Sequence, residues 1–142
     1  AGAPAAVVLP GNGDFRARPD PQGWLVSGAS GLTVGVCAAQ VILLAARTPD
    51  EDVVWTLVNA EHGSAATDPE DGTDIVTDVG RLRLTDYGAS EVLTGIEPDR
   101  AECVAAALVA STTAGITQWC VEAVTAHLRI REQFGKVIGT FQ

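Results

Sequence analysis

The feature that most constrains the fold is an alanine-rich stretch that runs from Pro98 to Arg131 without another proline. Apolar side chains such as Val104, Leu108 and Trp119 recur in it at steps of three and four residues, which is the period of an α-helix. About thirty residues make a helix of roughly 45 Å. A helix of this length cannot bury its apolar faces alone, so the sequence predicts one member of a helix bundle.

The start of this helix carries a capping pattern. Asp99 is the expected N-cap, and Glu102, three residues later, is spaced to complete a capping box. The other helices of a bundle are missing from the 142 residues, of which 46% are hydrophobic. We therefore expect this sequence to be a fragment of a longer protein whose other parts cover the apolar surface.

The residues before the helix favour short β-strands. Dense β-branched and aliphatic runs are separated by turn clusters such as 10–13 and 20–23. Many short strands at roughly ten-residue spacing are typical of an antiparallel β-barrel or sandwich. The expected strands are 6–9, 14–18, 24–27, 41–46, 53–58 and a short pair formed by 82–84 and 91–93.

The charge balance excludes some classes of function. The formal net charge is −9, and Lys136 is the only lysine among nine basic residues. Nucleic-acid binding normally needs a basic stripe, so we expect none. The acidic balance also gives no general attraction to anionic cofactors, and a site for one must use local arginines and backbone donors. No unbroken apolar run reaches the ~18 residues of a membrane span, so we expect no such span.

The cysteines and acidic residues give no metal signature. Cys37, Cys103 and Cys120 are odd in number and widely spaced, without a Cys-x-x-Cys pair or a histidine cluster. We interpret them as buried free thiols of a protein in the reducing cytoplasm, and we expect no metal site. The acidic stretch 67–74 is interpreted as a solvated loop, because it lacks the ligand spacing of an EF-hand calcium site.

The most specific motif closes the chain. Residues 131–142 read R-x-Q-F-G-x-x-I-G-x-F-Q and follow directly on the long helix. This pattern resembles the signature on the first long helix of the C-terminal domain of acyl-CoA dehydrogenases. The resemblance implies a flavoprotein fold, an acyl-CoA substrate and an oligomer, because in this family the motif grips the adenosine-pyrophosphate half of FAD across a subunit interface.

The resemblance also implies roles for individual residues. Arg131 would hold the FAD pyrophosphate with its guanidinium fork, and Phe134 and Ile138 would pack against the cofactor. The full set of cofactor-binding residues implied by the motif is Arg131, Gln133, Phe134, Ile138, Phe141 and Gln142. A purely structural interpretation stays open, in which Arg131 interacts with the helix C-terminus and the two phenylalanines fill a core.

The resemblance extends over the whole chain. The segment 23–28, Gly-Trp-Leu-Val-Ser-Gly, resembles the family's hairpin entry, and 41–48 resembles its strand that ends in Ala-Arg-Thr. The implied fold class is α+β, with an antiparallel β-barrel or sandwich as the middle domain (1–97). The second part (98–142) would be the first helix of a four-helix bundle, followed by the flavin-contacting loop.

The departures from the family pattern fall on the other half of the flavin site. Members usually hold the flavin ring with Trp-Ile-Thr or Trp-Ile-Ser, whereas 31–34 reads Gly-Leu-Thr-Val. The family's second flavin segment has the pattern Thr-Glu-Pro-x-x-Gly-Ser-Asp. In this chain the corresponding residues 8–14 begin with Val-Leu-Pro, so apolar residues replace the threonine and glutamate. The catalytic glutamate and its arginine, where members carry them early in the helix, fall on Ala105 and Ala106. We therefore assign no catalytic residue and interpret Glu102 as a capping residue.

The terminal motif for the adenosine-pyrophosphate half of FAD is preserved, whereas the two segments for the flavin ring are changed. This combination suggests the non-flavin subunit of a heteromeric acyl-CoA dehydrogenase. The resemblance implies FAD-dependent α,β-dehydrogenation of an acyl-CoA thioester by the assembly, in fatty-acid or sterol side-chain β-oxidation. It also implies a partner dehydrogenase subunit and an electron-transfer flavoprotein. Two alternatives stay open: a conventional homotetrameric dehydrogenase with a divergent flavin contact, and a non-enzymatic β-barrel scaffold or interaction module.

Overall fold

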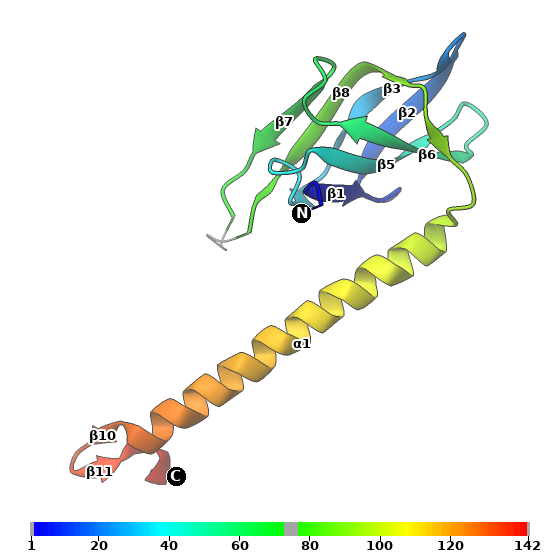
Figure 1. Cartoon of the computed structure of the whole chain (residues 1–142). Coiled ribbons are helices and arrows are strands. Elements are labelled where there is room, and N and C mark those ends of the chain that lie inside the picture. The colour runs from blue at the N-terminus through cyan, green and yellow to red at the C-terminus, as the bar shows by residue number, and fades with distance from the viewer. Residues whose placement is uncertain (1, 73–76, 142) are drawn as a thin grey trace. The chain divides into compact units, whose positions relative to one another are not determined.

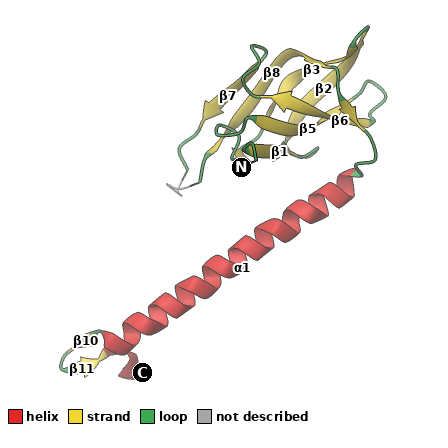
Figure 2. Ribbon diagram, viewed as in Figure 1, coloured by secondary structure: helices red, strands yellow, loops and turns green. Residues whose placement is uncertain are grey.

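The computed structural model describes residues 2–72 and 77–141. The chain divides into two compact units, Ala1–Ala101, here called the β-unit, and Glu102–Gln142, here called the helical unit. Figure 1 and Figure 2 show that strands build the first unit and that one long helix dominates the second.

The described strands of the β-unit form one sheet. The sheet follows the order β4-β8-β3-β2-β5-β6-β9, with β1 added on β5 and β7 added on β8. The strands are β1 Ala5–Val8, β2 Gly13–Asp20, β3 Gly23–Ser30, β4 Thr33–Val34, β5 Val41–Arg47, β6 Val53–Asn59, β7 Ala65–Pro69, β8 Val79–Ala89 and β9 Val92–Leu93. The first five expected strands are confirmed within a few residues at their ends, as is usual for boundaries read from sequence.

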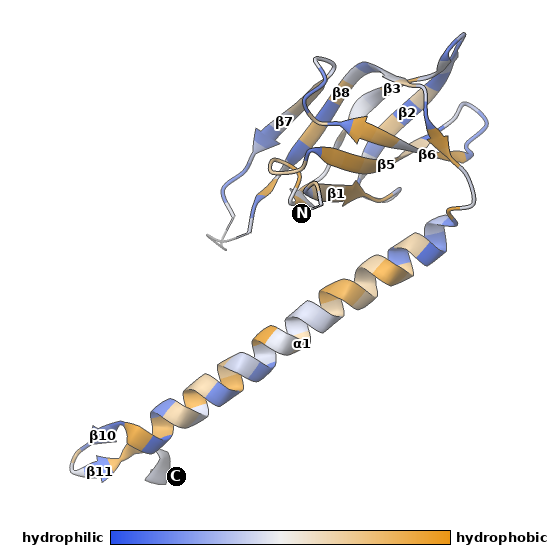
Figure 3. Cartoon of the chain, in the orientation of Figure 1, coloured by the Kyte–Doolittle hydropathy of each residue, from blue (hydrophilic) through white to orange (hydrophobic). Residues whose placement is uncertain are grey.

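Alternation along the strands places the core. In β8, Leu82 and Leu84 point inward while Arg81 and Arg83 point to solvent, which is the two-residue period of a strand with one buried face. Strands β1, β5 and β6 carry mostly apolar colour (Figure 3). The fully covered side chains of the core include Val8, Val26, Val36, Ile42, Leu44, Val58 and Leu82.

The sheet is mixed, which corrects the expectation of a purely antiparallel one. Strand β1 runs parallel to β5, with Ala5 opposite Val41, and β2 continues alongside the same strand with Arg16 opposite Arg47. The turn between β1 and β2 therefore shifts the chain sideways without reversing it. Both strands keep one direction beside β5, and local turn residues do not reveal this.

The region after β6 also differs from the expectation. The expected pairing of 82–84 with 91–93 is wrong, because β8 pairs with β3 and β7, and β9 pairs with β6. Part of the acidic stretch expected as a loop is strand β7. Its Asp68 pairs with Arg83 on β8, and Glu70 pairs with Arg81. Asp68 therefore lies on a strand, where the ion pair with Arg83 stabilises it, and Glu70 follows directly after that strand. Residues 73 and 74 of that stretch lie outside the described residues.

The long helix α1 spans Pro98–Ile130, in agreement with the expected length. Its first backbone hydrogen bond runs from the Ala101 N–H to the Glu97 carbonyl at 3.0 Å, which makes Glu97 the N-cap. Pro98 then occupies the first helical position, where its missing N–H is not needed. The expected cap at Asp99 is therefore wrong by two residues, and Asp99 lies in the first turn, where it favours the helix dipole.

The described residues leave the apolar side chains of α1 uncovered. Leu108, Ile116 and Trp119 are each at least 60% exposed, and no residue of the helix is buried. Polar side chains gather on one stripe at separations of four, seven and eleven residues, and Gln118 donates to Glu122 at 2.9 Å along it. The stripe consists of Arg100, Ser111, Gln118, Glu122 and Arg129. Figure 3 shows apolar colour over much of the remaining helix surface.

By length and composition alone, α1 could cross a membrane. Residues 103–121 contain no charged side chain, although uncharged polar residues interrupt the apolar runs within them. The expectation that no segment qualifies is therefore wrong on this criterion. A helix from the centre of a bundle meets the same criterion, so one such helix is weak support for a membrane span.

Candidate functional site

The expected cofactor motif forms a β-hairpin at the end of α1. Strands β10 (Glu132–Gln133) and β11 (Lys136–Val137) are antiparallel, with Glu132 opposite Val137 and Gln133 opposite Lys136. The 3₁₀-helix η1, Ile138–Thr140, follows. The Arg131 N–H donates to the His127 carbonyl at 3.0 Å, which is the hydrogen bond at the end of the helix. The Ile138 N–H donates to the Arg131 carbonyl at 2.8 Å. These bonds fix the hairpin to the last turn of the helix.

The hairpin turn holds its aromatic residue in an unusual conformation. Phe134 has φ 52° and Gly135 has φ 71°, so both central residues lie in the left-handed region that a tight two-residue hairpin requires. Glycine adopts this region freely, whereas for phenylalanine it costs about 1–2 kcal/mol. The Phe134 side chain is 93% exposed in this chain. The alternative that Phe134 fills a core receives no support from the described residues.

One face of the hairpin collects three of the six expected cofactor residues. The hydrogen bond between Ile138 and Arg131 continues the pairing of β10 with β11 by one step. Because paired residues and residues two apart share a face, Arg131, Gln133, Lys136 and Ile138 lie on one side, and Glu132 and Val137 lie on the other. Three of these four residues are sequence-predicted cofactor contacts, and Lys136 is one that the motif comparison did not assign.

The remaining predicted residues have different surroundings. Phe141 is about half exposed and donates its N–H to the Ile138 carbonyl at 3.2 Å, which closes η1. Gly139 faces the helix end: a Cβ built on it would lie 2.9 Å from the Leu128 carbonyl oxygen. Gln142 lies outside the described residues.

The basic residues on the strands of the β-unit have ion-pair partners, whereas those of the hairpin have none among the described residues. All five arginines on the strands of the β-unit have a carboxylate partner among the described residues, as Arg18 has in Asp86. Hydrogen bonding and charge from Glu51, with a further contribution from Asp14, raise the pKa of Arg16. In contrast, Arg131 and Lys136 of the hairpin have no carboxylate within ion-pair distance in the described part of the chain. Unpaired cations at this end suit an anionic ligand.

The β4 segment is built differently from a flavin-ring site. Thr33 is buried, and its hydroxyl lies 3.2 Å from both the Ser30 hydroxyl and the Gly31 carbonyl. The Asn12 amide donates to the same oxygen at 3.0 Å. Leu32 and Val34 on either side are 55% and 66% exposed. The surface here offers aliphatic side chains, and the hydroxyl is used inside the unit.

The second segment of the expected flavin half-site is tied to the first. Asn12 also donates to the Leu32 carbonyl at 3.1 Å, and its backbone N–H donates to the Leu9 carbonyl at 2.9 Å. The Asn12 side chain therefore braces the turn after β1 against β4. The missing threonine and glutamate can be read from the sequence, whereas the role of Asn12 cannot, because its contact with Leu32 joins residues twenty positions apart.

The described residues contain no group arranged for proton transfer at the expected position. Ala105 and Ala106 lie within α1 and carry no titratable side chain, and Glu102 is exposed one turn earlier.

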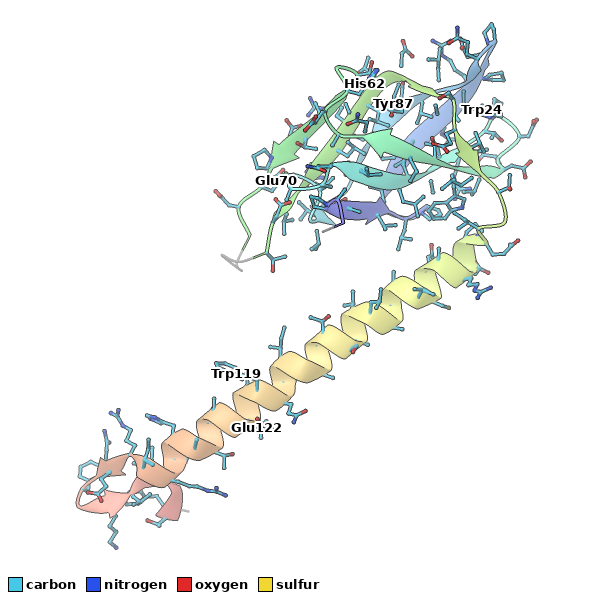
Figure 4. The ribbon with its side chains drawn as sticks, in the orientation of Figure 1. Trp24, His62, Glu70, Tyr87, Trp119 and Glu122 are labelled. Atoms are coloured by element: carbon cyan, nitrogen blue, oxygen red, sulfur yellow. The ribbon has the colours of Figure 1, made fainter. Side chains whose placement is uncertain are left out.

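A cavity of about 540 Å³ beside Tyr87 is lined by Gln40, Leu57, Asn59 and Glu91, among others. The Tyr87 hydroxyl accepts from the Asn59 N–H at 3.0 Å, and its ring meets that of His62 edge-on. Figure 4 labels both residues. Tyr87 therefore has a structural role there.

The three cysteines are free, and the expectation that all are buried is wrong. Cys103 and Cys120 are exposed on α1, because no described residue covers that helix. Cys37 is half-buried. Burial, together with the nearby Asp78 carboxylate, raises the pKa of its thiol. The same carboxylate accepts from the N–H groups of Cys37 and Ala38 at 2.9 Å, so Asp78 stabilises the turn before β5.

Comparison with known proteins identifies relatives along nearly the whole chain. No family model matches. The chain is 32% identical over 129 residues to acyl-CoA dehydrogenase FadE34 of Mycobacterium tuberculosis, a match that covers 91% of this chain and 17% of that protein.

Solved structures give the same result. A variant of the steroid acyl-CoA dehydrogenase Tcur3481-Tcur3483 is 27% identical, with a TM-score of 0.79, over 96% of this chain and 38% of that one. A glutaryl-CoA dehydrogenase from Mycobacterium smegmatis in complex with FADH2 shares the fold, with a TM-score of 0.80 at 20% identity, over 98% of this chain and 40% of that one.

The chain thus spans less than a fifth of the curated relative and about two fifths of these solved chains. Its sequence match, its mixed sheet followed by a long helix, and its terminal motif agree with one another. The chain belongs to the acyl-CoA dehydrogenase family.

Proposed function

We propose that this chain is part of a FAD-dependent acyl-CoA dehydrogenase and that it completes the FAD site of a partner subunit without holding a flavin ring of its own. The hairpin at the end of α1 would bind the adenosine-pyrophosphate half of the partner's cofactor. The parent assembly would be a heterotetramer in which further helices of each subunit complete a four-helix bundle with α1.

The use of the Thr33 hydroxyl is the observation that carries this proposal. Side-chain donors to a flavin ring have to be free on the surface, and the Thr33 hydroxyl is engaged inside the β-unit by Ser30, Gly31 and Asn12. Leu32 and Val34 supply only aliphatic surface, so the residues at this half-site do not fit an isoalloxazine ring. The hairpin does fit the other half of FAD, because it has unpaired cations and an exposed aromatic side chain.

Each residue of the hairpin would contact the part of FAD that suits its side-chain chemistry. The Arg131 guanidinium suits two oxygens of a pyrophosphate at once, and Gln133 beside it has both a donor and an acceptor. Phe134 and Ile138 would exclude water from the adenosine side. When bound, FAD supplies the hydride acceptor for α,β-dehydrogenation of an acyl-CoA thioester. No proton transfer is assigned to this chain, so the catalytic base would come from another part of the assembly.

The proposal also covers the setting of the reaction. One relative is named a steroid acyl-CoA dehydrogenase, which supports a sterol-derived acyl-CoA as the substrate class. Electrons would pass to an electron-transfer flavoprotein, as the family resemblance implies. The three free cysteines agree with a location in the reducing cytoplasm.

The test is the flavin absorbance of the parent subunit, purified alone and after co-expression with a partner dehydrogenase subunit. We expect a colourless lone subunit and a yellow complex that loses its flavin when Arg131 is replaced by methionine. The Arg129→Met variant removes the same charge from the polar stripe of α1 and should keep its flavin.

Each other outcome has a definite meaning. A lone subunit that binds FAD stoichiometrically would contradict the proposal and make the protein a conventional homotetrameric dehydrogenase. A complex without flavin would favour the scaffold alternative.

A further inference from the structure

Lys136 is the only lysine of the chain, and its position is specific. It lies on β11 directly opposite Gln133, next to the tight turn of the hairpin. Its side chain is exposed. The family motif leaves this position open, so nothing in the sequence comparison gives it a role.

The pairing of the hairpin gives Lys136 its neighbours. Cross-strand partners point to the same face, so Lys136 shares its side with Gln133, and Arg131 lies on that side two residues before Gln133. The acidic residue of the hairpin, Glu132, lies on the opposite side, opposite Val137. One face therefore has two cations and no carboxylate, although the chain as a whole has a formal charge of −9.

Lys136 and Arg131 also lack an ion-pair partner among the described residues, which strengthens the case for an anionic ligand on this face. Each arginine on the strands of the β-unit has a carboxylate within 4 Å, whereas neither Lys136 nor Arg131 has one among residues 2–72 and 77–141. The interaction with the helix dipole explains an unpaired cation in the last turn, where Arg129 lies. It does not explain Lys136, which lies beyond the helix on the second strand of the hairpin.

We propose that Lys136 is a further phosphate-binding residue of the dinucleotide site and that it contacts the pyrophosphate of FAD alongside Arg131. This inference rests on the proposed function of the hairpin. The two residues differ in chemistry: the arginine fork fixes the orientation of the phosphates, and the lysine adds a mobile point charge. The ligand feature that Lys136 recognises is the negative charge of the diphosphate, not the flavin ring.

The experiment measures FAD binding to the assembled complex of the parent subunit and its partner. Apoprotein is titrated with FAD at several salt concentrations, and the dissociation constant is compared for wild type, Lys136→Met and Lys136→Arg. We expect Lys136→Met to weaken FAD binding about tenfold, which corresponds to about 1.4 kcal/mol. Its salt dependence should also be shallower, because one charge contact with phosphate is lost. Lys136→Arg should stay within about twofold of wild type.

Two control variants, Arg129→Met and Arg131→Met, separate the role of Lys136 from the proposed function of the hairpin. Arg129→Met removes one positive charge from a neighbouring part of the helical unit and should not change FAD affinity. If Arg131→Met releases FAD but Lys136→Met binds it like wild type with an unchanged salt dependence, the role of Lys136 is refuted and the proposed function stands. If neither variant affects FAD, the proposed function of the hairpin fails as well. Thermal unfolding of each variant checks that the exposed substitution leaves the fold intact.

Discussion

At the scale of single residues, hydrogen-bond partners decide which side chains remain free for a ligand. Thr33 and Phe134 make the contrast clear. The Thr33 hydroxyl is surrounded by three polar partners and is buried, whereas the Phe134 ring is exposed at the tip of a strained turn. A residue held in an unfavourable backbone conformation with its side chain in solvent is typical of a binding contact. Two residues of similar importance in the motif comparison therefore have opposite structural roles.

Replacing Thr33 by valine tests its internal role. The change keeps the shape of the side chain but leaves the Asn12 amide without its buried acceptor. We expect the free energy of unfolding of the β-unit to fall by about 1–3 kcal/mol, measured by urea denaturation. Flavin content of the assembled complex should not change. The matched control is Thr85→Val on β8, where the threonine is exposed and little change in stability is expected. A loss of flavin with unchanged stability would show that Thr33 contacts the cofactor after all.

Replacing Phe134 by asparagine separates stability from binding. Asn-Gly is the preferred pair for this turn, so the substitution should relieve strain and slow amide hydrogen exchange across residues 132–137. Loss of the ring should at the same time weaken FAD binding several-fold in the complex. Phe134→Ala removes the ring without supplying a favoured turn residue, so it should weaken FAD without slowing exchange. If FAD affinity is unchanged in both variants, Phe134 is not a cofactor contact.

At the scale of elements, the hairpin depends on its attachment to α1. The hairpin has only two residues in each strand, which is too few for independent stability. It is anchored by the hydrogen bond from Ile138 to Arg131 and by the close approach of Gly139 to Leu128. The glycine of the motif is therefore needed to let η1 lie against the helix end, and the helix serves as the support for the cofactor contacts.

Replacing Gly139 by alanine tests this attachment. The added Cβ would come within 2.9 Å of the Leu128 carbonyl oxygen, so η1 has to move away from the helix end. We expect a loss of about 1–3 kcal/mol of local stability, seen as faster hydrogen exchange at the amides of Ile138 and Phe141. The control is Gly115→Ala in the middle of α1, where nothing lies within 4 Å in this chain and the change should stabilise the helix by about 1 kcal/mol. Equal exchange rates in wild type and Gly139→Ala would argue against the packing role.

At the scale of the whole molecule, the two units have very different amounts of core. The β-unit buries its aliphatic side chains within one sheet, whereas no residue of α1 is buried. The apolar surface of α1 extends around most of its circumference, apart from the polar stripe from Arg100 to Arg129. A helix with this distribution is stable in a bundle, where neighbouring helices remove the apolar side chains from water.

This surface leads to a prediction about the isolated chain. We expect the 142-residue chain to self-associate through α1 at increasing concentration, measured by sedimentation velocity, because exposed apolar side chains favour association. Leu108→Glu places a charge on the apolar surface and should reduce association. Ser111→Glu places the same charge on the polar stripe and should have little effect. A chain that stays monomeric throughout, or an equal response to both substitutions, would contradict the assignment of the two surfaces.

The sequence by itself determined the parts of this protein that local patterns encode. Alternation and turn residues gave β1, β2, β3, β5 and β6, the three- and four-residue period gave α1, and the terminal motif gave the family. These signals are readable because each depends on residues that are near one another in the chain. The position of Lys136 opposite Gln133 also follows from a local pairing, but only once the turn at Phe134 is known.

Only the tertiary structure decided the features that join distant residues. The parallel course of β1 and β2 along β5, the strand within the acidic stretch and the partners of β8 depend on register between segments that are far apart in sequence. The inward orientation of Thr33 depends on Asn12, twenty-one residues earlier. Local propensity carries no information about such contacts, because the geometry of the assembled sheet sets their energy. The sequence could therefore show that a flavin residue was replaced, and the fold was needed to show where its hydroxyl points.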